Sequence, residues 1–190
     1  MPTFEKSYTH DAVTAGLTTN PTAIDTVGAG GVYSVECIGA DGKVKWTDTF
    51  NNKVMNTGVQ DMNTKYFTGS VYSAALYLGL VTGPGSGLTF AAGDTLASHT
   101  WTENTGYAGT RKLVTFGTAT TASPSVISSS AAPTSFAINA TSNIAGAFLC
   151  TVTSGTSGVL FSAGNFTVGD KLVSSGDTLN VTYTFSLTAV

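Results

Sequence analysis

The fold of this chain is decided by residues 46–81, WTDTFNNKVMNTGVQDMNTKYFTGSVYSAALYLGLV. The stretch opens within a run in which apolar and polar side chains alternate, and this period of two is the pattern of a half-buried strand. One side of that run carries Val44, Trp46, Asp48 and Phe50. From Val71 to Val81 apolar residues fall on both sides, as in a strand covered on both faces. The stretch therefore predicts two strands with a short element between them.

The element between the two strands is predicted to be a short helix that ends at Gly69-Ser70. Thr57 and Gln60 have the spacing of a capping box, in which two side chains satisfy free backbone amides. Asp61 fits the first turn, where a negative charge interacts favourably with the helix dipole. Apolar residues then recur at helical spacing. We expect the packing unit of the domain, with the helix closing one end, to consist of Trp46, Phe50, Val59, Met62, Phe67, Leu76 and Leu78, with Tyr66 on the same helix face.

Upstream of this stretch, the sequence predicts a hairpin preceded by an arm. Two alternating runs, GVYSVECI and KVKWTDTF, flank Gly39-Ala40-Asp41-Gly42, and Asp-Gly between such runs is a strong hairpin signal. Residues 1–30 show no hydrophobic periodicity. They form either a flexible leader or an extended arm that becomes ordered on a neighbouring subunit. We therefore divide the chain into an N-terminal arm, residues 1–30, and a β-sandwich domain, residues 31–190.

Downstream, strands alternate with polar loops. Residues 91–111 are long, polar and irregular, and Val126-Ile127 is short enough for an edge strand. The final run alternates most regularly, with apolar residues at Leu179, Val181, Tyr183, Phe185 and Leu187. With SFAINA, AGAFLCTV and GVLFSAG, the total is about eight to ten strands and one short helix. The predicted fold is an all-β, antiparallel, jelly-roll-like sandwich.

Composition restricts the function. Charged residues make up only 10% of the chain, and the formal net charge is −3 without any cluster of Lys or Arg, so no nucleic-acid partner is expected. A surface so poor in charge is more typical of a protein docked in an assembly than of a free monomer. The charged N-terminus predicts no signal peptide, and the lack of a long apolar run predicts no membrane span. We expect synthesis in the cytoplasm.

The two cysteines do not suggest a reactive site. Cys37 and Cys150 each lie within an apolar strand pattern, which favours buried free thiols. A disulfide between them would require the two strands to meet. His10 and His99 stand apart from any Cys, so no Cys/His metal site is predicted.

The remaining candidates for chemistry are isolated polar residues. Gly-Asp recurs at Gly93, Gly169 and Gly176, where the aspartates either bind a cation or, as we prefer, form turns. Asp48 and Asp61 are conceivable as an acid/base pair, but their spacing does not show one. His99, near Ser98 and Glu103, has the residue types of a hydrolase triad without the surrounding Gly-x-Ser-x-Gly motif. We predict no catalytic, cofactor or metal site, and no enzyme.

Two aromatic residues in the polar segment 91–111 are candidates for binding. Trp101 and Tyr107 could stack on a sugar ring or on a side chain of a partner. Alternatively, they hold the loop down over the end of the sandwich.

Several motifs resemble those of a family of small virion structural proteins of tailed bacteriophages. They are the W-x-D-x-F-x-N-x-V run from Trp46 to Val54, GVQDMNTKYF, YLGLVTGPGS, AGDTLASH, GAFL at Gly146 and the closing GDTLNVTYTFSLT. The resemblance covers most of residues 32–190. It implies a phage particle and, within it, a capsid decoration (cement) protein, a β-sandwich that oligomerises on the capsid surface and stabilises contacts between capsomers.

The resemblance also implies partners and a location. The expected partners are the major capsid protein and further copies of this chain, as a dimer or trimer, and the expected location is the capsid surface of the virion. One alternative is a tail fibre or spike component that binds host-surface glycans through Trp101 and Tyr107. A less favoured alternative is a cell-envelope-degrading enzyme, which the sparse carboxylates argue against. No cofactor is expected.

Overall fold

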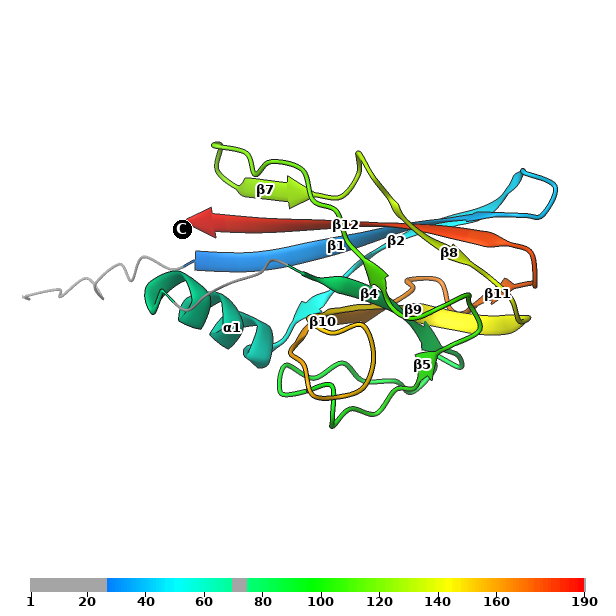
Figure 1. Cartoon of the computed structure of the whole chain (residues 1–190), viewed down its shortest axis with the longest axis horizontal. Coiled ribbons are helices and arrows are strands. Elements are labelled where there is room, and N and C mark those ends of the chain that lie inside the picture. The colour runs from blue at the N-terminus through cyan, green and yellow to red at the C-terminus, as the bar shows by residue number, and fades with distance from the viewer. Residues whose placement is uncertain (1–26, 70–74, 190) are drawn as a thin grey trace, which may run out of the picture.

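The computed structural model describes residues 27–69 and 75–189. These residues form twelve strands and one helix, arranged as two antiparallel sheets that pack against each other (Figure 1). This arrangement is the antiparallel β-sandwich predicted from the sequence. Residues 1–26, most of the predicted N-terminal arm, lie outside the described residues.

The first sheet is built around the two longest strands. From edge to edge it contains β2 (Val44–Asn51), β1 (Val27–Ile38), β12 (Thr178–Ala189) and then, end to end along β12, β7 (Ser125–Ser128) and β8 (Thr134–Ala137). β1 and β12 pair over their whole length, from Val27 opposite Ala189 to Ile38 opposite Thr178. β1 thus includes Val27–Gly30, which the sequence had placed in the arm. Backbone pairing with β12 holds these residues in the sheet although they show no apolar alternation.

The predicted hairpin and edge strand are both present in this sheet. β1 and β2 are joined by the turn at Gly39–Gly42, where Gly42 has a φ of +77°, a left-handed conformation that glycine adopts without strain. β7 is the edge strand expected at Val126-Ile127. The alternation of the last strand is confirmed as well, because its odd-numbered apolar residues from Leu179 to Phe185 are buried.

The second sheet has a long centre and short edges. From edge to edge, the strand order is β3 (Lys53–Val54), β10 (Leu160–Asn165), β9 (Ser142–Cys150), β4 (Tyr77–Thr82) and β5 (Glu103–Asn104). Two short strands complete the sheet: β11 (Lys171–Val173) pairs with β9, and β6 (Lys112–Leu113) pairs with β4. Leu78 to Val81 in β4 are all buried, as expected for a strand covered on both faces. The chain passes between the sheets repeatedly, from β2 to β3, β6 to β7, β8 to β9 and β11 to β12.

The main core fills the space between the two sheets. Aromatic and aliphatic side chains from both sheets pack there, among them Tyr33, Phe136, Leu149 and Leu179. A buried polar contact lies within it, because the hydroxyl groups of Tyr33 and Ser162 are 2.8 Å apart. Tyr183 joins this contact and accepts a hydrogen bond of 2.8 Å from the amide of Asn52. The two sheets are therefore joined by hydrogen bonds as well as by apolar packing.

A second, smaller core lies apart from the first. It contains Met55, Phe148, Leu160 and Trp101. Partly buried Leu88 and Phe90 pack against it from the irregular segment that follows β4. Leu96 and Trp101 of this core come from residues 91–111, so the segment predicted to be a polar, irregular loop covers part of the second sheet with its few apolar residues.

The helix α1 (Asn56–Phe67) lies at the end of the sandwich where β1 begins and β12 ends (Figure 1). The predicted capping box is wrong, because no side chain caps the helix and the Thr57 hydroxyl instead donates to the carbonyl of Leu160. Nor is Asp61 in the first turn, which has no acidic residue. The first turn of the helix packs on β10, with Gly58 against the backbone of Phe161.

Candidate functional site

The two aromatic residues considered for binding are both buried. Trp101 is 4% exposed, stacks on His99 with ring centroids 3.7 Å apart, and packs against Phe148 of the second core. Tyr107 is 3% exposed and meets Phe136 edge to face. The hypothesis that these rings contact a glycan or a partner is therefore wrong. The alternative reading, in which they hold the loop against the domain, agrees with their positions.

The three Gly-Asp aspartates act in separate turns. Asp94 accepts a hydrogen bond from the amide of Ala91, and Asp170 accepts one of 2.7 Å from the amide of Gly85. Asp177 accepts hydrogen bonds from the amide of Ser174 and from Lys45, whose Nζ lies 2.6 Å away. Among the residues that the structure describes, no group of three or more His, Cys, Asp or Glu side chains could hold a metal ion. Asp94 and Asp177 therefore bond within their own turns, whereas Asp170 joins its turn to the distant loop at Gly85.

The other acidic candidates each have a basic partner of their own. Asp48 pairs with Lys171 at 3.2 Å, and Asp61 pairs with Lys65 at 2.9 Å, one helical turn away. Glu103 binds the guanidinium of Arg111 through both carboxylate oxygens, at 2.9 and 2.7 Å. Glu103 is thus engaged by Arg111, and the ring of His99 lies on Trp101. The arrangement accounts for these residues as ion pairs and packing contacts.

The two thiols are buried and free, as the sequence predicted. Burial, together with the charge of Asp177, raises the pKa of Cys37 to about 11. Burial also raises the pKa of Cys150, although a backbone hydrogen bond at Val152 and the charge of Arg111 act in the opposite direction. Both side chains are therefore protonated at neutral pH and behave as small apolar groups.

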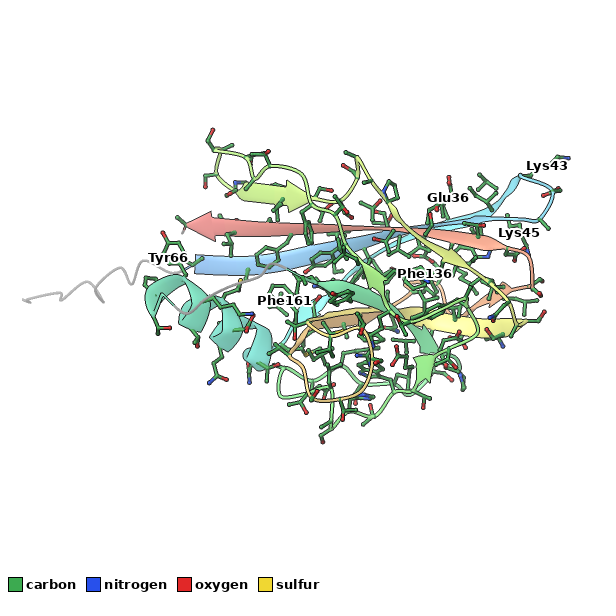
Figure 2. The ribbon with its side chains drawn as sticks, viewed as in Figure 1. Glu36, Lys43, Lys45, Tyr66, Phe136 and Phe161 are labelled. Carbon is green, nitrogen blue, oxygen red and sulfur yellow. The ribbon has the colours of Figure 1, made fainter. Side chains whose placement is uncertain are left out.

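The feature best suited to function is an apolar groove at the α1 end of the sandwich, which we call the α1 groove. Its volume is about 760 Å³. From the sheets it is lined by Val27, Ala29, Phe161 and Leu187. From α1 it is lined by the apolar side chains of Val59, Met62, Tyr66 and Phe67. Figure 2 shows Tyr66 at this end of the molecule and the charged residues Glu36, Lys43 and Lys45 at the opposite end.

The α1 groove is lined by five of the nine exposed large apolar side chains of the described residues. Tyr66 is 83% exposed, Phe67 77% and Val27 69%, and Val59 and Leu187 are exposed as well. The other exposed large apolar side chains of the described residues are Val44, Leu113, Val168 and Leu172. The charged residues of the lining are Asp61 and Lys65, which pair with each other. Soluble monomers seldom expose contiguous apolar patches of this kind, and such patches commonly mark interaction sites.

The strand beside the groove, β1, has an edge at Val27–Gly30 that no strand of the described residues covers. β1 pairs with β12 along its whole length, but its pairing with β2 extends only from Ile38 to Val32. The next contact is a hydrogen bond from the amide of Asn52 to the carbonyl of Gly31. Within the described residues, no strand pairs with the second edge of Val27–Gly30. This edge therefore presents backbone donors and acceptors next to an apolar groove.

The apolar residues of this site are recognisable in the sequence, but their exposure is not. Val59, Met62, Tyr66 and Phe67 were recognised as one helix face but were interpreted as packing residues of the domain. That interpretation is correct for Met62, which packs against the main core, and wrong for Phe67, which is exposed. An apolar helix face has the same sequence pattern whether it packs against the core of its own domain or binds another molecule.

Comparisons of this chain with protein-family models, with curated proteins and with solved structures gave no significant match. Within residues 27–69 and 75–189, the helix is too short and too polar to cross a bilayer.

Proposed function

We propose that this chain is a virion structural protein of a tailed bacteriophage, and that within the particle it is a capsid decoration protein. In this role many copies of the chain oligomerise on the capsid surface and stabilise the contacts between capsomers. The major capsid protein is the proposed partner. The motifs between Trp46 and Thr188 that resemble phage structural proteins support the phage context.

The observation that carries the proposal is the α1 groove with the free edge of β1 beside it. Exposed Tyr66, Phe67 and Val27 form an apolar surface that association would bury. Each such contact is modest, but a capsid lattice repeats it many times, and linked weak contacts give a strong combined attachment. A chain with few charges and an apolar end fits this kind of assembly better than it fits a freely diffusing monomer.

Copy number in purified particles tests the proposal. Quantitative mass spectrometry of the phage that encodes this chain, with the major capsid protein as internal standard, should find hundreds of copies per particle. A matched measurement on particles that lack the chain should show earlier loss of DNA on heating. A few copies to a few dozen per particle would contradict a decoration protein and would favour a fibre or spike component.

A further inference from the structure

The α1 groove and the edge of β1 together have the features of a strand-addition site. In such sites an exposed strand edge binds the backbone of an extended segment, and an adjacent pocket accepts alternate side chains. Val27–Gly30 provide the edge, and Val27 and Ala29 are at the same time part of the groove lining. An occupant that only covered Tyr66 and Phe67 would leave the backbone groups of the edge without partners.

The chemistry of the site restricts its occupant. The groove is concave and almost entirely apolar, and its acidic and basic residues, Asp61 and Lys65, already form an ion pair. A segment that carries charge toward the groove would lose hydration without gaining an unpaired opposite charge. The fitting occupant is therefore an extended, uncharged segment with apolar side chains at alternate positions.

Residues 13–18 of this chain, VTAGLT, have these properties. Although residues 1–30 as a whole show no hydrophobic periodicity, Val13, Ala15 and Leu17 alternate locally with Thr14, Gly16 and Thr18, and this short segment contains neither a charge nor a proline. This alternation directs the apolar residues to one side of an extended strand. The remaining link to β1 is residues 19–26, which can span roughly 26 Å when extended. Val27, the first residue of β1, is itself part of the groove lining.

We propose that the α1 groove binds residues 13–18 of a second copy of this chain, as a strand added beside Val27–Gly30. Reciprocal exchange between two copies forms a closed pair, since the same contact is then made twice. The proposal rests on the proposed function and deepens it, because it names the contact through which copies join. It identifies the N-terminal segment as the connecting element and α1 as its receptor.

Disulfide mapping between two full-length preparations tests this contact. One preparation carries Phe67→Cys and an affinity tag. The other carries a single cysteine substitution at one of positions 13 to 18. After mixing and mild oxidation, Val13→Cys, Ala15→Cys and Leu17→Cys should give several-fold more linked heterodimer than Thr14→Cys, Gly16→Cys and Thr18→Cys. Native Cys37 and Cys150 are buried and present in every sample.

The matched control for the mapping is Val168→Cys in place of Phe67→Cys. Both side chains are 77% exposed, but Val168 lies outside the groove. Little linkage is expected with Val168→Cys at any of the six positions. Equal linkage at alternate positions, or equal linkage to both receptors, would overturn the proposal. So would a Leu17→Cys/Phe67→Cys double variant that links only within its own chain.

The oligomeric state gives a second test that does not depend on cysteine placement. Light scattering of the full-length chain at micromolar concentration should show a dimer or a larger oligomer. Tyr66→Ser/Phe67→Ser should shift it to the monomer, whereas Val168→Ser should not. A wild-type monomer, or a double variant that keeps the wild-type mass, would overturn the proposal. These experiments use the purified chain, so their failure is separate from a low copy number on particles, which would overturn the proposed function.

Discussion

At the scale of single residues, the tightest constraint lies where β9 and β10 meet. A Cβ atom added at Gly146 would stand 2.0 Å from the carbonyl oxygen of Gly164 and 2.7 Å from the Cα of Asn165. Both contacts are with backbone, which cannot move aside as a flexible side chain can. Glycine is therefore required at this position by the neighbouring strand.

We expect Gly146→Ala to destabilise the domain by about 1–3 kcal/mol or more, the range for overpacked interiors. Gly93→Ala is the control, because nothing lies within 4 Å of the added atom there. Urea unfolding of both variants measures the difference in the free energy of unfolding. Equal stability of the two variants would contradict the strand packing described for β9 and β10.

The thiols provide a second residue-scale prediction. Because burial raises the pKa of Cys37 to about 11, against about 8.5 for a free cysteine, the reactive thiolate is scarce at pH 8. We expect both thiols of the folded chain to react with a thiol-specific reagent at least about 100-fold more slowly than in denaturant. Fast modification of the folded protein would show that a thiol is accessible and that its side of the sandwich opens.

At the scale of elements, the turn before β12 is held to the β1–β2 hairpin by charge. Burial of Asp177 opposes its ionisation, but hydrogen bonds from Lys45 and the Ser174 amide outweigh this effect and keep the pKa of Asp177 below its usual value. A carboxyl group whose pKa is lower in the folded state stabilises that state above the unfolded pKa. The contribution is lost as pH falls through the folded pKa.

Asp177→Asn is therefore expected to lower stability at pH 7 by about 1–2 kcal/mol and to flatten the loss of stability below about pH 4. Thermal unfolding between pH 2.5 and 7 measures both effects. Asp94→Asn is the control, since Asp94 lies in an exposed turn. If the wild type and Asp177→Asn lose stability in parallel on acidification, the ionised Asp177 does not hold this turn.

The elements that follow from local sequence were predicted, and those that depend on distant contacts were not. The β1–β2 hairpin and β12 could be predicted because alternation and Asp-Gly are local signals. The start of α1 could not, since Thr57 bonds to Leu160, a residue far away in the chain. Leu88, Phe90, Leu96 and Trp101 are scattered through an irregular segment without a sustained period, so the sequence did not predict the second core to which they contribute.

The candidate site was hidden for a similar reason. The apolar face of α1 was visible in the sequence, but only the fold shows that Tyr66 and Phe67 point away from the core. The free edge of β1 could not be predicted, because it depends on where β2 stops pairing at Asn51. The helix of this site could therefore be predicted from the sequence, but the way that it packs against the sheets could not.

At the scale of the whole molecule, the two ends of the sandwich differ in character. The hairpin end carries Glu36, Lys43 and Lys45, and the opposite end carries the exposed apolar residues of the α1 groove (Figure 2). Exposed apolar side chains are more numerous at the α1 end than in the hairpin, where Val44 is exposed between Lys43 and Lys45. In the proposed decoration protein, the α1 end would face a neighbouring copy, and the hairpin end would remain hydrated.

Decoration of a phage capsid, the function proposed for this chain, is tested most directly by an image of the particle. Cryo-electron microscopy of the phage that encodes the chain, compared with particles that lack it, should show added density at regularly repeated positions over the whole capsid surface. The sandwich should fit that density. Added density confined to the tail or its fibres, or no difference between the two particles, would contradict the account.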